Sequence, residues 1–221
     1  MAFQPFDREA ERTGYVRHLP HWRQGGCTYF ATFRLGDSIP MARRDEWLRE
    51  RAQWLRLRGL QSIDELGRLP LEQRRIFQRT FTRKMHEMLD AGYGSCLFRD
   101  PHLAEVVANA LRFFDGERTA LGDFVVMPNH AHALVTPIEN WPLEKWSQSV
   151  KRFSAREVNR VRGVQGPLWQ EESFDHIVRS EAQLAFFREY IRENPVKAGL
   201  HPGEYVLGCG SDRGPDLQSG S

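Results

Sequence analysis

Residues 125–137, VVMPNHAHALVTP, decide how the rest of the chain is interpreted. Two short apolar runs flank a Pro-Asn pair, a pattern typical of two strands joined by a tight turn. We therefore predict strands at 121–127 and 131–136. His130 and His132 stand where the second strand begins, and residues two apart in a strand point to the same face. The sequence thus predicts an imidazole pair on one side of a β-hairpin.

The imidazole pair admits two interpretations. Alternate residues of a strand lie about 6.6–7 Å apart, so two rings on one face can converge on a single metal ion. The rings can instead donate to backbone carbonyls or cap the turn, and the short tripeptide alone does not separate the two possibilities. Ala131 and Ala133 fall on the opposite face, which predicts that this side of the strand packs against a helix.

Outward from the hairpin, short strands alternate with amphipathic helices. A first strand is expected within GGCTYFATFRLGDSIP, residues 25–40, and a short strand and turn within residues 166–180. Apolar residues at helical spacing predict helices over residues 41–60, 69–92, 100–117, 142–163 and 180–200. Asp100 and Ser180 are expected to cap two of these helices. Hairpin neighbours without regular βαβ units predict an α+β fold, in which an antiparallel sheet carries helices against one face.

The composition is that of a folded protein without a membrane span. Of the 221 residues, 40% are hydrophobic and 27% are charged. No apolar run is long enough to cross a bilayer and the first residues lack the apolar stretch of a secretory signal, so we expect a cytoplasmic protein. The wide spacing of Cys27, Cys96 and Cys209 predicts free thiols and argues against a disulfide framework or a zinc knuckle. The net charge of +2 is a weak electrostatic footprint for a nucleic-acid-binding protein.

The last predicted helix carries two polar side chains that are candidates for a site. Tyr190 and Asn194, in YIREN, stand four positions apart, so they share one helical face and lie about 6 Å apart along the axis. Each also has a simpler explanation. Tyr190 can be an amphipathic side chain at a helix–sheet contact, and Asn194 can cap a helix that ends before Pro195.

Three segments, taken in order, resemble one known family. VVMPNHAHALV, GPLWQEESFDHIVR and YIRENPVKAGL are similar to motifs of the REP-associated tyrosine transposases, members of the single-strand tyrosine transposase family within the HUH superfamily. The segment at residues 25–40 also resembles the first strand of that family, so the likeness extends from about residue 20 to residue 201. The resemblance implies an RRM-like, ferredoxin-like antiparallel sheet. It also implies a nuclease and strand transferase that acts on single-stranded DNA.

The resemblance further assigns roles to individual residues. It implies that His130 and His132 hold a divalent metal together with a polar residue on the tyrosine helix, a position that Asn194 matches. It implies that Tyr190 is the nucleophile, which attacks the scissile phosphate to leave a 5′-phosphotyrosine and a free 3′-OH. The family's substrates are REP hairpins flanked by a short tetranucleotide. Two imidazoles and an amide oxygen suit Mg²⁺ or Mn²⁺, and the imidazoles would also accept Zn²⁺ in vitro.

Contacts to DNA are expected from basic side chains. Helix 142–163 has a strongly basic outer stripe, and basic groups there can neutralise phosphates while indoles stack on bases. The candidates are Lys145, Lys151, Arg152, Arg156 and Lys197 for phosphates, with Trp169 and Trp141 for stacking. A solvated helix face and two core indoles would explain the same residues equally well.

We expect one domain over residues 1–208, with a helical insertion at about 41–91 whose role is unassigned and a disordered tail at 209–221. The expected partner is single-stranded or hairpin DNA, bound by a nucleoid-associated monomer or homodimer. Two rival functions stay open. One is a non-catalytic nucleic-acid-binding protein derived from such a transposase, and the other is an unrelated metallohydrolase that uses the same histidines.

Overall fold

The computed structural model describes residues 3, 13–16, 20–23, 26–139, 141–171 and 174–210. At its centre is an antiparallel sheet with the strand order β6-β3-β5-β4-β7. Its strands are β3 (Tyr29–Arg34), β4 (Thr119–Met127), β5 (His130–Pro137), β6 (Phe174–Ile177) and β7 (Val206–Cys209). A separate pair, β1 (Thr13–Val16) and β2 (Pro20–Arg23), precedes them.

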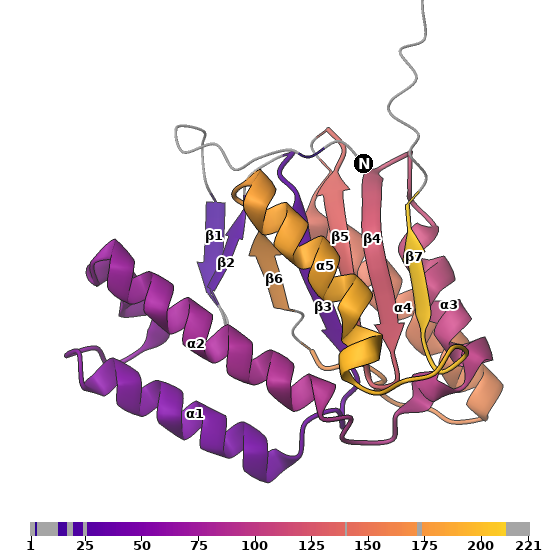
Figure 1. Ribbon diagram of the computed structural model, residues 1–221, viewed down its shortest axis with the longest axis horizontal. Helices are drawn as coiled ribbons and strands as arrows, with labels where there is room; N and C mark the ends of the chain where they lie inside the picture. Colours follow the sequence, from indigo (N-terminus) through magenta and orange to yellow (C-terminus); the bar gives the residue numbers. More distant parts are fainter. Residues whose placement is uncertain are drawn as a thin grey trace, which may run out of the picture.

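Five α-helices join or cover these strands in the described part of the chain (Figure 1). They are α1 (Met41–Arg56), α2 (Leu71–Asp90), α3 (Pro101–Arg112), α4 (Leu143–Arg162) and α5 (Glu181–Lys197), with short 3₁₀ turns at Ile63–Arg68 and Leu97–Arg99. Both predicted caps are confirmed, because the Asp100 carboxylate accepts the His102 N–H and the Ser180 hydroxyl accepts the Gln183 N–H. None of the described helices combines the length and the apolar character that a membrane crossing requires.

The order of the strands confirms the expected fold class. If β3, β4, β5 and β6 are numbered 1 to 4, their order in the sheet is 4-1-3-2. Helices connect strand 1 to strand 2 and strand 3 to strand 4. This βαββαβ arrangement is ferredoxin-like. The strand β7 extends it by pairing with the free side of β4.

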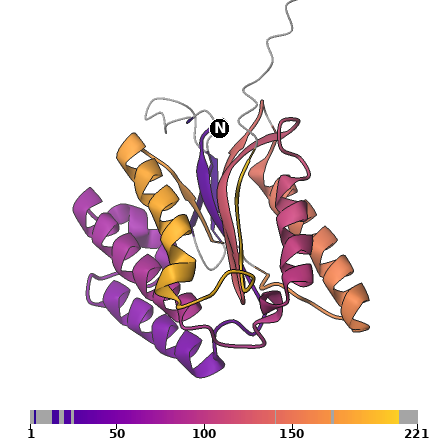
Figure 2. The ribbon, with the colours of Figure 1, turned by 45° about the vertical axis from the view of Figure 1, so that its right-hand side comes forward.

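Helices cover both faces of the sheet, so the prediction of helices on one face is wrong (Figure 2). On one face, Phe33 and Ala131 pack with Trp146 of α4 and with α3. On the other, Phe30 and Leu134 pack with Ile191 of α5. The central strands are apolar on both sides, and such a strand is stable only when both of its faces are shielded from water. Ala131 and Ala133 do face helices, as predicted from their size.

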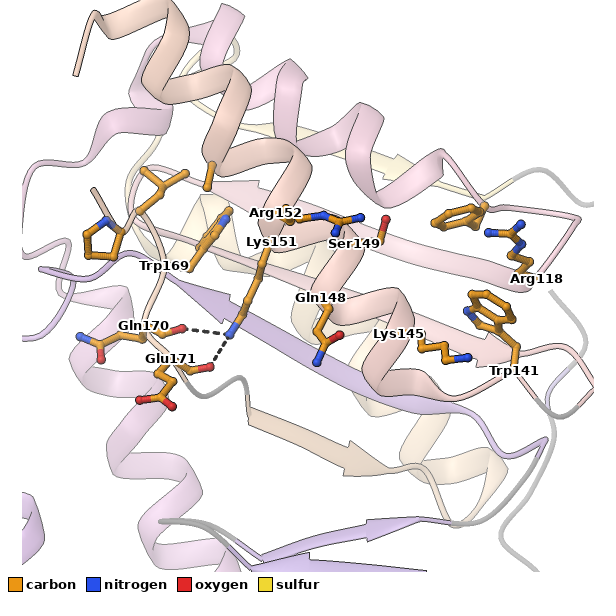
Figure 3. Close-up of a pocket in the computed structure, with 14 residues that line it drawn as sticks. Arg118, Trp141, Lys145, Gln148, Ser149, Lys151, Arg152, Trp169, Gln170 and Glu171 are labelled. Carbon is orange, nitrogen blue, oxygen red and sulfur yellow. Dashed lines mark hydrogen bonds between the residues drawn. The ribbon is translucent and has the colours of Figure 1, made fainter. Parts of the chain in front are cut away.

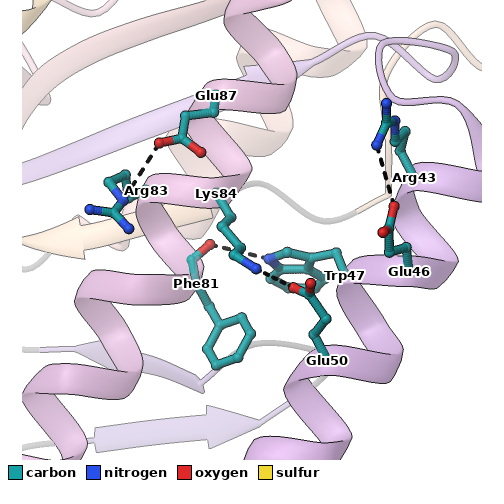
Figure 4. Close-up of polar contacts among 8 residues, drawn as sticks. All are labelled: Arg43, Glu46, Trp47, Glu50, Phe81, Arg83, Lys84 and Glu87. Carbon is teal, nitrogen blue, oxygen red and sulfur yellow. Dashed lines mark hydrogen bonds and ion pairs between the residues drawn. The ribbon is translucent and has the colours of Figure 1, made fainter.

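The predicted insertion has a core of its own. Helices α1 and α2 lie side by side and bury Trp47, Leu55, Phe77 and Phe81 between them. The Trp47 indole N–H donates to the Phe81 carbonyl at 3.2 Å, and Lys84 pairs with Glu50 at the rim (Figure 4). This small core holds the two helices together, and α2 is the member that contacts the sheet domain.

The C-terminal strand was not predicted from the sequence. The expected tail began at Cys209, but this residue ends β7, and the Gly210 N–H donates to the Gly122 carbonyl at 2.9 Å. A Cβ at Gly208 would lie 2.5 Å from the Phe124 ring, so glycine permits this close approach of the strand. The rest of the predicted tail, residues 211–221, lies outside the described residues.

Candidate active site

Strand β5 places both imidazoles beneath α5, and both are fully buried. Their ring centroids are 4.6 Å apart. Each ring is held through Nδ1: His130 Nδ1 lies 2.7 Å from Asn129 Oδ1, and His132 Nδ1 lies 2.8 Å from Thr32 Oγ1. Neither Nε2 atom has a hydrogen-bond partner among the described residues. The pair is therefore fixed from one side and presents two Nε2 atoms on the other.

Helix α5 brings Tyr190 and Asn194 to the same place. The centroid of the Tyr190 ring lies 5.3 Å from that of His132, and Asn194 is 2% exposed. The Tyr190 Oη and the Asn194 Oδ1 are also buried without a hydrogen-bond partner in the part of the chain that the structure describes. The alternative in which Asn194 caps the helix is wrong, because α5 continues through Pro195 to Lys197.

Helix α2 contributes two residues that the sequence did not assign to the site. The His86 ring stacks on the Tyr190 ring at a centroid distance of 5.1 Å. Asp90 Oδ1 accepts the Asn194 Nδ2–H at 3.4 Å and lies 3.9 Å from His130 Nε2. His86 and Asp90 stand four positions apart on one helical face. The sequence could have indicated that these two side chains share a helical face, but no local pattern in it indicates that residue 90 lies next to residue 194.

Burial sets the charge state of the site. It lowers the pKa of His130 to about 3 and that of His86 to about 4, and it lowers the pKa of His132 well below the usual value. Burial also raises the pKa of Asp90 to about 6 and, together with the Asp90 charge, moves the pKa of Tyr190 far above its usual range. At neutral pH the imidazoles thus keep free lone pairs, and the phenol needs help to lose its proton.

The donor atoms fit a divalent cation. Buried polar atoms without partners are uncommon in folded proteins, and here two imidazole nitrogens, an amide oxygen and a phenol oxygen gather in one place. Nitrogen and oxygen donors of this kind bind Mg²⁺, Mn²⁺ or Zn²⁺. Within the described ranges, no three His, Cys, Asp or Glu side chains are grouped to hold a metal ion. Binding would therefore require the Asn194 oxygen or oxygens of the substrate.

The predicted DNA contacts on α4 lie on the other face of the sheet (Figure 2). Lys145, Lys151 and Arg152 line a cavity of about 670 Å³ there, beside Trp141 (Figure 3). The Arg118 guanidinium lies 4.5 Å from the centroid of the Trp141 ring. Lys151 donates to the carbonyls of residues 170 and 171, which fixes its position in the cavity wall. The structure thus keeps these cations apart from the imidazole pair.

The other predicted contacts have different surroundings. Trp169 is largely buried in the wall of the same cavity, and its indole N–H donates to the Ser154 hydroxyl at 2.9 Å. Arg156 is exposed beside Glu157. Lys197 lies on the same helix as Tyr190 and pairs with Glu193 at 2.6 Å. Of the predicted phosphate contacts, Lys197 alone shares an element with the candidate nucleophile.

The buried imidazoles predict loss of stability in acid for the metal-free protein. His130, His132, His86 and His176 all have pKa values lowered by burial, so between pH 6.5 and about 4 only their unfolded forms take up protons. Each can remove up to about 1.4 kcal/mol of unfolding free energy per pH unit. Asp90, whose pKa is raised, works in the opposite direction. We expect the free energy of unfolding to fall by about 2 kcal/mol or more from pH 7 to pH 5.

Urea denaturation in the presence of a chelator, at pH 7, 6 and 5, measures this loss. Replacing the largely buried His176 by glutamine should make the dependence on pH shallower, because it removes one of the imidazoles whose pKa burial lowers. A free energy of unfolding that stays constant between pH 7 and 5 would contradict the burial of neutral imidazoles.

Comparison with known proteins adds little to this geometry. No protein-family model matches the chain. An uncharacterized protein of Haemophilus influenzae is 31% identical in a segment that covers 34% of this chain and 54% of that protein, so the chain spans about half the length of this curated relative. A solved structure of a REP-associated tyrosine transposase bound to a REP hairpin has 18% identity and a TM-score of 0.41, and the match covers 86% of this chain and 76% of that one. A structural match with such a low identity and TM-score gives no information about activity.

Proposed function

We propose that this protein is a metal-dependent endonuclease and strand transferase that acts on single-stranded, hairpin-containing DNA through a 5′-phosphotyrosine. One observation carries the proposal: the Tyr190 oxygen, both imidazole Nε2 atoms and the Asn194 oxygen converge from α5 and β5, and none of them has a geometric hydrogen-bond partner among the residues that the structure describes. The motifs that contain these residues resemble those of the REP-associated tyrosine transposases, and the resemblance supports the same roles.

Each residue of the site has a separate role in the proposed reaction. The Tyr190 oxygen attacks phosphorus, a new oxygen–phosphorus bond forms, and the bond from phosphorus to the 3′-oxygen breaks, so that the 3′-oxygen leaves and takes up a proton from water as a 3′-OH. Asp90, which lies beside the phenol and has a pKa of about 6, is a carboxylate that can accept the phenol proton. His130, His132 and Asn194 would hold Mg²⁺ or Mn²⁺, which when bound polarises the phosphate and offsets its developing charge.

The phenol favours strand transfer over hydrolysis. A covalent phosphotyrosine keeps the energy of the phosphodiester, so attack by a 3′-OH can rejoin strands without ATP. A metallohydrolase activates water and has no use for a phenol beside its donor atoms. A non-catalytic binding protein has no reason to keep four donor atoms buried without partners, since each costs stability.

A hairpin oligonucleotide incubated with the protein and Mn²⁺ tests this proposal. A 3′-terminal label should migrate with the protein on a denaturing gel, while a 5′-terminal label should be released on a shorter fragment that ends in a 3′-OH. A metallohydrolase would cut the DNA without forming the adduct. A binding protein would shift the oligonucleotide in a native gel but leave it intact.

We further propose that the cavity beside α4 contacts the DNA backbone. Four cations, Arg118, Lys145, Lys151 and Arg152, line it together with the single carboxylate of Glu171. This excess of positive charge favours phosphates, and the Trp141 indole beside it provides an aromatic surface. DNA bound in this cavity reaches Tyr190 only around an edge of the sheet, since the two lie on opposite faces.

Reversing two of these charges should weaken DNA binding. The double variant Lys145→Glu and Arg152→Glu changes exposed side chains, so folding should be unaffected. We expect the affinity for a hairpin oligonucleotide to fall by about tenfold or more, and the log–log salt dependence to become shallower by about 0.7–0.9 per lost phosphate contact. Fluorescence anisotropy over a range of salt concentrations measures both. Arg49→Glu, on the exposed surface of α1, is the matched control, and equal losses in the two proteins would contradict a specific role for the cavity.

A further inference from the structure

The turn that ends α2 touches the candidate metal ligands through Asn129. The side chain of Asn129 is 1% exposed. Its Nδ2 donates to two backbone carbonyls, that of Leu89 at 3.3 Å and that of Tyr93 at 3.0 Å. Its Oδ1 lies 2.7 Å from His130 Nδ1. A continuous chain of hydrogen bonds therefore links the end of the helical insertion to the first imidazole.

These contacts determine which nitrogen of His130 carries the proton. A backbone carbonyl can only accept, so the NH₂ group of Asn129 must face Leu89 and Tyr93, and its Oδ1 must face the ring. Because that oxygen also only accepts, Nδ1 must carry the hydrogen. A neutral imidazole holds one proton in all. The lone pair is consequently on Nε2, the atom without a partner.

The same turn orients the amide of Asn194. Asp90 is the last residue of α2, and its Oδ1 accepts the Nδ2–H of Asn194. An ionised carboxylate cannot donate, so the amide nitrogen is held on the Asp90 side. The amide oxygen is then directed away from Asp90, and it is the second donor atom without a partner. The Nε2 atom of His130 and the Oδ1 atom of Asn194 therefore each present a lone pair to a bound cation.

The residues that follow the turn are themselves fixed to the sheet domain. The Ser95 N–H donates at 2.8 Å to Oδ2 of Asp37, which lies three residues after the end of β3. Gly94 has a φ of +88°, and a Cβ there would lie 2.5 Å from the Asp37 carbonyl oxygen. Only glycine avoids both the backbone strain and this clash. The position of the Tyr93 carbonyl is thus set by β3 as well as by α2.

We propose that the turn Leu89–Tyr93, acting through Asn129 and Asp90, presets the donor atoms of His130 and Asn194 for a divalent cation. Asn129 and Asp90 are positioning residues in this scheme. The inference rests on the proposed function and gives the helical insertion a role in it, because the donor set is assembled only when α2 is docked. Partners in this position commonly change metal affinity by about 10- to 100-fold when they are lost.

The test uses the full chain without DNA. Nitrogen-15 NMR of labelled histidines in metal-free protein should show His130 protonated at Nδ1 and bare at Nε2. In Asn129→Ala the two tautomers should mix and the Mn²⁺ affinity, measured by electron paramagnetic resonance titration, should fall by about 10- to 100-fold. Asn129→Asp keeps an acceptor for the Nδ1–H but cannot donate to the Leu89 and Tyr93 carbonyls, so the tautomer should be retained although the bonds to the turn are lost. A purely structural role would not separate these two variants.

Asp90→Asn is the second variant, and it decides the question if Asn129→Ala does not fold. Its amide can face Asn194 in either orientation, so Mn²⁺ affinity should fall while the His130 tautomer is unchanged. Asn109→Ala, on the exposed surface of α3, is the control and should match the wild type. A wild-type His130 protonated at Nε2, or full Mn²⁺ affinity in both Asn129→Ala and Asp90→Asn, would overturn the inference.

The outcome is distinguishable from failure of the proposed function. If Mn²⁺ binds with the expected dependence on Asn129 but no DNA adduct forms, the positioning role stands and the nuclease proposal fails. If the wild type takes up no Mn²⁺, the positioning role is overturned whether or not an adduct forms.

Discussion

Replacing Tyr190 by phenylalanine is expected to abolish the covalent protein–DNA adduct while hairpin binding stays within about twofold of the wild type. The change removes one oxygen and leaves the ring, which packs edge-on against Phe30 and stacks on His86. No other group at the site can replace the phenol as a nucleophile that leaves a stable phosphotyrosine, so adduct formation should fall by about 1,000-fold or more. Denaturing gels with a 3′-labelled hairpin and Mn²⁺ measure the adduct.

The folding of this variant provides an internal check. The Tyr190 hydroxyl lies beside the Asp90 carboxylate and the Asn194 amide, and the ring keeps its packing in phenylalanine, so the Tm should change little. Tyr205→Phe is the matched control, because Tyr205 packs against the same core beneath α5. An adduct that survives in Tyr190→Phe and disappears in Tyr205→Phe or Tyr93→Phe would mean that the nucleophile is a different tyrosine.

His130→Ala and His132→Ala should each lower Mn²⁺ affinity by about 100-fold or more, and cleavage should fall with it. Each variant removes one of two imidazole donors, which amide and phosphate oxygens cannot replace. Isothermal titration calorimetry at pH 7.5 measures the affinity. In a thermal melt, 1 mM Mn²⁺ should raise the Tm of the wild type but not of these variants, because ligand stabilisation depends on binding to the native state.

His176→Ala is the control that tests whether a lower Mn²⁺ affinity comes from a lost metal ligand or from lost packing. His176 is also a largely buried imidazole on the α5 face, where it contacts Phe187 and lies 2.8 Å from the Gln183 amide. Its replacement should destabilise the protein while leaving the Mn²⁺ affinity unchanged. Equal losses of affinity in the His176 and His132 variants would show that the imidazole pair acts only through the packing of the sheet.

Local sequence patterns were sufficient for strands β3 to β6 and for the five α-helices, but not for β1, β2 or β7. They were also sufficient for two parts of the site, the imidazole pair of β5 and the polar pair of α5, but not for the part that α2 contributes. The Pro128-Asn129 turn predicted the hairpin, and the spacing of Tyr190 and Asn194 predicted that both would share one helical face. Their approach to the imidazoles was expected only from the family resemblance, since spacing within a helix says nothing about which strand the helix covers. The structure brings them together.

What the sequence did not reveal depends on contacts between distant segments. Asp90 and His86 reach the site because α2 docks against α5, and no periodicity in residues 69–92 encodes that contact. The cations of α4 lie on the opposite face because the crossover between β5 and β6 carries α4 to that side. Trp169 is buried because the segment before β6 runs beside the end of β3, where its indole fills the space next to Ser154.

The complete enclosure of the two Nε2 atoms has a dynamic consequence. If the proposed function holds, the described conformation is a closed one, because atoms that water barely reaches cannot meet a phosphodiester, which is far larger. On that proposal, a phosphodiester reaches Tyr190 only in the fraction of molecules in which α5 has lifted from β5 or α2 has moved aside. Apparent affinity is then the intrinsic affinity scaled by the open fraction. Substitutions that loosen the Phe30–Phe187 stack, 4.2 Å between centroids, would tighten DNA binding without touching a single ligand.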